Sequence, residues 1–111
     1  MQMKPDINNV SATGYIDVSK RKIEITVTNK NIMPISKCKI NCTFTLLFVK
    51  SGTYSSTEYG RGTKTIEIND IAGNSEINES VSFNPDDYYD SYGSYITAIV
   101  TEKRVTIDSI E

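Results

Sequence analysis

The stretch CKINCTFTLLF, residues 38–48, decides the fold of this chain. Its even positions carry cysteine, isoleucine, phenylalanine or leucine six times in succession, and most of its odd positions carry lysine, asparagine or threonine. Successive side chains of a strand point to opposite faces, so this pattern predicts a strand with one face on a core and one on water. Leu47 and Val49 interrupt the polar positions, and we expect the second face to be partly covered there.

β-Branched residues dominate the rest of the composition. The 111 residues include 15 isoleucines, 7 valines and 12 threonines, against two leucines and three alanines. β-Branched side chains fit a pleated sheet better than a helix, whereas a helical domain would need many leucines and alanines. The composition therefore predicts an all-β protein, and the length predicts one domain over residues 1–111.

Shorter alternating segments lie on both sides of the central stretch. We expect further strands near residues 10–18, 23–28, 64–68, 77–83, 96–100 and 105–107, and a hairpin loop or short irregular edge strand over 53–62. Segment 96–100 is apolar on both faces and predicts a central, well-covered strand, while Glu79 predicts an edge position for its own strand. Seven or eight short strands without a helix predict an antiparallel immunoglobulin-like β-sandwich.

Charge and residue content argue against several functions. The net charge of −2 and the pI of about 5.1 lack the positive excess typical of a nucleic-acid binder. The longest apolar run, residues 46–49, is far shorter than the roughly 20 residues of a membrane-spanning helix, so we expect no membrane insertion. The chain has no histidine, which removes Ser-His-Asp and Cys-His catalysis within it. We expect a protein that is not an enzyme and that needs no cofactor.

Two short motifs have structural rather than chemical interpretations. Cys38 and Cys42 would lie about 13 Å apart on a strand, whereas a disulfide requires α-carbons within about 7 Å. Without a further cysteine or histidine they also make a poor zinc site, so we expect two buried thiols. Residues 60–65, GRGTKT, lack the spacing and the helix of a phosphate-binding loop and predict a flexible hairpin tip.

Three separated elements resemble a known bacterial family. Val27-x-Asn29 supplies a V-x-N turn, residues 47–52 supply an apolar strand end followed by glycine, and Gly73 with Phe83 supplies a glycine turn and a strand that closes on phenylalanine. In this order they resemble the FxLYD type of immunoglobulin-like domain, over residues 14–101.

The resemblance is incomplete at two positions. Val49 stands where the family has aspartate, and Thr45 stands where it has phenylalanine. The resemblance implies an immunoglobulin-like fold and a module of a cell-surface protein or lipoprotein, without catalysis.

The stretch NPDDYYDSYGSY, residues 84–95, is the candidate functional segment. One interpretation is a calcium site formed by Asp86, Asp87 and Asp90, because Ca²⁺ prefers six to eight oxygen ligands. The ligand order of an EF-hand fails, since Tyr88 and Ser91 occupy required positions. We therefore expect no metal and keep calcium as the less favoured alternative.

A second interpretation of this stretch is structural. Immunoglobulin-like domains often carry a tyrosine at this corner, whose hydroxyl bonds back to preceding backbone. Tyr95 or Tyr92 fits that role loosely and would then be a packing residue.

A third interpretation is recognition of a partner. Tyrosine offers a large amphipathic contact area at low entropic cost, so Tyr88, Tyr89 and Tyr92, with Asp86 and Asp87, are the candidate partner-binding residues. On extended backbone Tyr88 and Tyr89 would point to opposite sides, and we expect at least one of them to be exposed.

The sequence thus predicts a non-catalytic protein-interaction module, for which a bacterial cell-surface protein or lipoprotein outside the cytoplasm is the preferred source. The alternative is a small stand-alone bacterial or phage protein that binds and blocks one protein target. No secretory leader is visible at the start of the chain.

Overall fold

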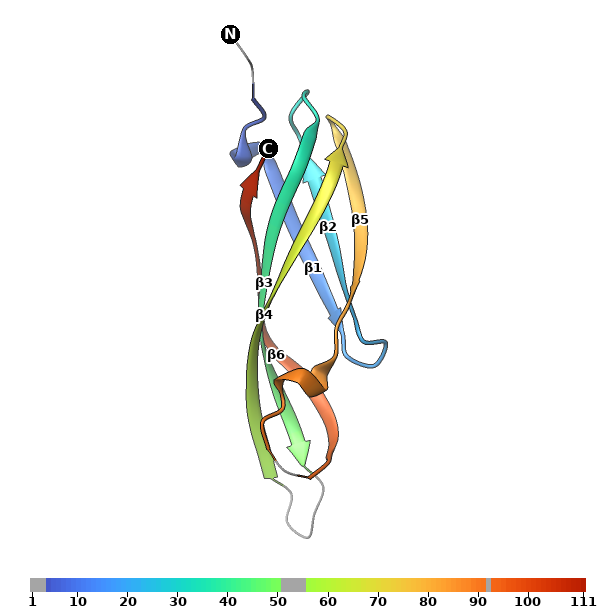
Figure 1. Ribbon diagram of the computed structural model, residues 1–111, viewed down its shortest axis with the longest axis vertical. Coiled ribbons are helices and arrows are strands. Elements are labelled where there is room, and N and C mark those ends of the chain that lie inside the picture. Colours follow the sequence, from blue (N-terminus) through green and yellow to red (C-terminus); the bar gives the residue numbers. More distant parts are fainter. Residues whose placement is uncertain (1–3, 51–55, 92) are drawn as a thin grey trace.

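A computed structural model describes residues 4–50, 56–91 and 93–111, which form two antiparallel sheets (Figure 1). The strands and the two short 3₁₀ helices, in chain order, are η1 Ile7–Asn9, β1 Val10–Asp17, β2 Lys22–Asn29, β3 Ile35–Lys50, β4 Ser56–Ile71, β5 Ser75–Ser82, η2 Pro85–Tyr88 and β6 Tyr95–Ile110. One sheet has the order β1-β2-β5 and the other β4-β3-β6. The all-β prediction is confirmed, and the described residues form six strands rather than seven or eight. Within the same residues, no helix is both long and apolar enough to span a membrane.

The molecule is a rod measuring 67 × 20 × 16 Å. Its radius of gyration is 17.3 Å, compared with about 13 Å for a compact domain of this length. The cause is the length of β3, β4 and β6, which have 16 residues each and therefore extend about 53 Å. Both ends of the chain lie at the same end of the rod (Figure 1).

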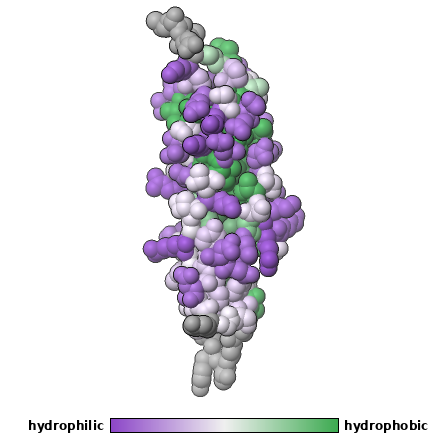
Figure 2. Space-filling model, in the orientation of Figure 1, coloured by the Kyte–Doolittle hydropathy of each residue, from purple (hydrophilic) through white to green (hydrophobic). Residues whose placement is uncertain are grey.

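The two sheets face each other over only half of this length. Strands β1, β2 and β5 have eight residues each, so they cover the upper half of the longer sheet in Figure 1. One apolar core runs through both sheets, and its fully buried members include Ile23, Ile25 and Val27 of β2. The surface seen in Figure 2 is mostly hydrophilic, with smaller apolar groups between the polar ones.

Strand β3 forms as its alternation predicts. Its even side chains from Cys38 to Phe48 are between 0% and 3% exposed. Both cysteines are free and buried, as expected. Burial raises the pKa of each thiol, which favours the unreactive protonated form.

Three predictions about β4 and β6 are wrong. The predicted hairpin tip at residues 60–65 lies inside β4, whose pairing with β3 continues through Gly60 and Gly62. Strand β6 runs unbroken through the expected connection at residues 102–104 and joins the two strands predicted at 96–100 and 105–107. It lies at an edge of its sheet rather than at the centre. The edge position predicted for the strand around Glu79 is confirmed, because β5 is the last strand of its sheet.

A buried asparagine ties together the loops at the upper end. The side chain of Asn29 is fully buried, and its amide nitrogen donates to the backbone carbonyls of Met33 (3.0 Å) and Ala72 (3.2 Å). Its amide oxygen accepts from the backbone and the side chain of Asn31, at 2.9 and 3.0 Å. All hydrogen-bonding groups of this side chain are therefore used, which fixes the β2–β3 loop against the β4–β5 turn.

Candidate protein-binding surface

The segment between β5 and β6 takes the place of the second sheet in the lower half of the rod. Figure 1 shows η2 lying across this half, where β1, β2 and β5 do not reach. The segment begins with Asn84, whose side chain caps η2 by accepting from the backbone nitrogen of Asp86 at 3.1 Å. Pro85 at the first helical position is buried, and its fixed φ favours this turn.

Aromatic rings join this segment to β3. Tyr88 packs edge-on against Phe44, with ring centroids 4.8 Å apart, and stacks with Phe83 at 5.7 Å. Tyr89 and Tyr95 both contact Phe48, each with centroids 4.9 Å away. Pairs in this range add about 0.5–1.5 kcal/mol each beyond the buried area. Three of the four tyrosines of the candidate segment thus help to complete the core.

Two glycines of β4 let the segment approach the sheet. A Cβ atom at Gly60 would lie 2.2 Å from the backbone oxygen of Tyr88, and a Cβ at Gly62 would lie 2.3 Å from Cε1 of its ring. Neither position tolerates a larger side chain without movement of η2. The glycines that suggested a turn are therefore required by a close approach inside a strand.

The tyrosines of the segment do not lie as expected. Tyr88 and Tyr89 are both half-buried and both pack on the core, so the prediction that at least one of them is exposed is wrong. The reason is that η2 curls the backbone, whereas the prediction assumed an extended chain. Asp86 and Asp87 are exposed, and Tyr92 lies outside the described residues. A partner-binding role for these five residues stays a prediction.

Tyr95 is a packing residue, as the structural interpretation proposes. Its hydroxyl donates to the carboxylate of Asp86 rather than to backbone. Burial, and then this hydrogen bond, raise the pKa of Tyr95 to about 12. The bond joins the first residue of β6 to η2, so the two ends of the segment are held together.

The calcium interpretation finds no support in the geometry. Asp86, Asp87 and Asp90 are all exposed. Among residues 4–50, 56–91 and 93–111, no three carboxylate, thiol or imidazole side chains form a group that could hold a metal ion.

The described residues form no second layer over the other face of sheet β4-β3-β6. The strand register places its outward side chains in cross-strand rows, each with one residue from β4, one from β3 and one from β6. Three neighbouring rows are Tyr59–Leu47–Ile99, Arg61–Thr45–Glu102 and Thr63–Thr43–Arg104. A register shift between Thr45 and Leu46 keeps the β6 members of these rows on the outer face.

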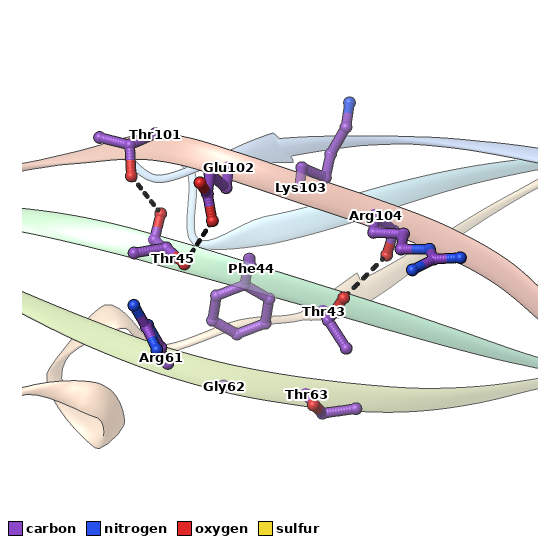
Figure 3. Close-up of a pocket in the computed structure, with 10 residues that line it drawn as sticks. All are labelled: Thr43, Phe44, Thr45, Arg61, Gly62, Thr63, Thr101, Glu102, Lys103 and Arg104. Carbon is purple, nitrogen blue, oxygen red and sulfur yellow. Dashed lines mark hydrogen bonds between the residues drawn. The ribbon is translucent and has the colours of Figure 1, made fainter.

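An open hollow of about 950 Å³ lies over the two polar rows (Figure 3). Its threonines bind neighbouring strands, since Thr101 donates to the backbone oxygen of Thr45 at 3.3 Å and Thr45 donates to Glu102 at 3.4 Å. Lys103 turns away from the hollow and donates to the backbone oxygen of Gly14. The hollow therefore presents hydroxyl groups at its floor and longer charged side chains at its sides.

Three charged side chains around the hollow have no oppositely charged partner among the described residues. Arg61, Glu102 and Arg104 are exposed, and none of them forms an ion pair within the described parts of the chain. In the upper half of the same sheet, by contrast, Lys37 lies 4.0 Å from Glu67 and 3.8 Å from Glu111.

Beside the hollow lies an apolar row. Tyr59 and Ile99 are 65% and 49% exposed, with Leu47 between them. The sequence carries the signal for this row, because Leu47, Val49 and segment 96–100 are apolar on the face expected to be polar. This pattern predicts that other residues pack over the second face of the sheet. None of the described residues of this chain does so.

The chain matches no known protein-family model, no curated protein and no solved structure.

Proposed function

We propose that this chain is a non-catalytic protein-interaction module that binds its partner through the outer face of sheet β4-β3-β6. The surface consists of the three rows defined above. The observation that carries the proposal is the juxtaposition of an exposed apolar row with a row in which Arg61 and Glu102 have no ion-pair partner among the described residues.

The chemistry of this surface suits a protein partner. Interface cores are rich in tyrosine and arginine and are surrounded by a polar rim, and here Tyr59 and Arg61 are neighbours on the same face of β4. The hollow is shallow and lined by hydroxyl groups, which differs from the enclosed apolar pocket typical of small-molecule sites.

The immunoglobulin-like class, the FxLYD resemblance and a bacterial cell-surface or lipoprotein origin belong to the same proposal. The rod shape supports only the cell-surface origin, because a rod attached through its chain ends would hold its opposite end far from the attachment (Figure 1).

Substitution of the apolar row tests the proposal. The variant Tyr59→Ser/Ile99→Ser should lose at least about tenfold of the partner recovered from source cells, since hot-spot residues contribute roughly 2 kcal/mol or more. A control is Ile32→Ser, which removes a more exposed apolar side chain (87%) from the loop between β2 and β3, outside the three rows.

Quantitative mass spectrometry of pull-downs would measure recovery. Equal recovery by both variants contradicts the proposed surface. A third variant, Asp87→Lys, tests the η2 segment. Loss of the partner in this variant alone would show that the partner binds at the η2 segment and not at the three rows.

A further inference from the structure

We propose that the partner on this face is a second copy of the same chain, an inference that rests on the proposed function. Two sheets with the same twist stack with their mean strand directions within about 30° of each other. Two identical faces meet through a twofold axis in the plane of the interface. The outer face of β4-β3-β6 offers such a surface, since β3 is its central strand.

The direction of the twofold axis decides which side chains meet. An axis along β3 places β4 of one copy over β6 of the other and keeps each cross-strand row opposite itself. Because Arg61 and Glu102 occupy the same row, Arg61 then faces Glu102 of the second copy, and the symmetry repeats this pair. In the next row Tyr59 faces Ile99, and Leu47 meets its own equivalent.

An axis across the strands gives a poorer match. It sets β4 on β4 and β6 on β6. Where the axis passes through the row of Arg61, Arg61 and Glu102 each meet their own equivalents, and where it passes between this row and the apolar row, they meet Tyr59 and Ile99. Where it passes between the two polar rows, Glu102 meets Arg104 of the second copy, but the row Tyr59–Leu47–Ile99 then lies on the polar row Thr65–Asn41–Thr106. The axis along β3 is selected because it pairs Arg61 with Glu102 and also buries the apolar row against itself.

The size of the surface limits the affinity. Three or four rows on three strands cover about 20–27 Å by about 14 Å, or about 300–400 Å² per copy. The total is below the roughly 1,200 Å² of a standard stable interface, so we infer a weak, concentration-dependent dimer. It must be measured at concentrations of about 0.02–1 mM, where contacts of this class associate.

Sedimentation equilibrium of the full chain tests the inference. We expect concentration-dependent dimerisation, weakened by added salt because each dimer contains two exposed ion pairs. Arg61→Glu and Glu102→Arg should each weaken association about tenfold or more, because each sets like charges opposite one another twice. The double variant Arg61→Glu/Glu102→Arg restores opposite charges and should return the dissociation constant to within about threefold of wild type.

A swap higher on the same sheet serves as the control. Lys37→Glu/Glu67→Lys exchanges one ion pair and removes a second, between Lys37 and Glu111, both outside the three rows, and it should leave association unchanged. Thermal melts verify that every variant is folded.

Two results would overturn the second copy as partner: a wild-type chain that stays monomeric to about 1 mM, or a double variant that is folded but does not recover. If the chain is monomeric while Tyr59→Ser/Ile99→Ser still loses another protein, the outer face binds a partner other than a second copy. If the chain is monomeric and the pull-down shows no loss, the outer face is not a binding surface at all.

Discussion

Replacing Gly62 with alanine should push the η2 segment off the sheet. The new Cβ would lie 2.3 and 2.5 Å from two ring carbons of Tyr88, and an ordinary contact begins near 3.4 Å. The ring of Tyr88 would have to move by about 1 Å. A gap of this width removes a quarter to a half of the dispersion energy of each contact that the ring makes on its other side. The ring cannot rotate freely, because it is packed between Phe44 and Phe83.

The expected loss of stability follows from two opposing effects. Overpacking of this kind costs about 1–3 kcal/mol, while replacing glycine reduces the entropy of the unfolded chain and returns about 0.4–1 kcal/mol. The net loss for Gly62→Ala is about 1–2 kcal/mol, which lowers Tm by roughly 4–8 °C. Urea unfolding followed by circular dichroism measures this directly.

A second variant shows whether Tyr88 is the cause. In a Tyr88→Ala background the clash with the ring is absent, and a contact of 2.9 Å to Phe44 remains. Tyr88→Ala should itself cost about 3 kcal/mol, within the usual folding margin of about 5–15 kcal/mol. There Gly62→Ala should cost less than about 1 kcal/mol, because only Phe44 has to shift, giving a coupling energy of about 1 kcal/mol. An equal cost of Gly62→Ala in both backgrounds would refute the packing of η2 on this glycine.

Three further predictions concern other parts of the chain. Asn29→Asp keeps the shape but removes the two hydrogen bonds to the carbonyls of Met33 and Ala72 and buries a carboxylate, so it should cost about 3–5 kcal/mol in urea unfolding; a loss below about 1 kcal/mol would contradict this network. The folded pKa of Tyr95 is raised to about 12, above an unfolded value of about 10, so its contribution to stability is present below pH 10 and is lost as pH rises to about 12. Ultraviolet titration should show this midpoint, which Asp86→Asn lowers and Tyr95→Phe abolishes, and an unchanged midpoint in Asp86→Asn would exclude the bond. Cys38 and Cys42 should react with a disulfide reagent only as the chain unfolds in urea, and rapid labelling of the native protein would show that they are accessible.

The central strand could be predicted because its signal is local. Each even side chain from Cys38 to Phe48 is apolar, and strand geometry alone then places all of them on one face. The length of β4 could not be predicted in this way. Gly60 and Gly62 have low strand propensity, and they belong to β4 because of Tyr88, which is 26 residues away from Gly62 in the sequence.

The candidate site was harder to predict for a similar reason. From the sequence, the tyrosines of residues 84–95 are expected on the surface. In the structure, Phe44 and Phe48 lie beyond the short sheet, and the rings of Tyr88, Tyr89 and Tyr95 pack on them. The composition of residues 84–95 cannot show which partner lies next to them. The outer rows depend on the register of three strands, which is set by pairing between distant segments.

The placement of both chain ends at one end of the rod has a mechanical consequence. Val10 opens β1 and Ile110 closes β6 there, and each of these strands lies at the edge of its own sheet. A force pulling these two ends apart would load the backbone hydrogen bonds one rung at a time and unzip each edge strand. The fold is thus poorly built to transmit tension from one end of the described chain to the other.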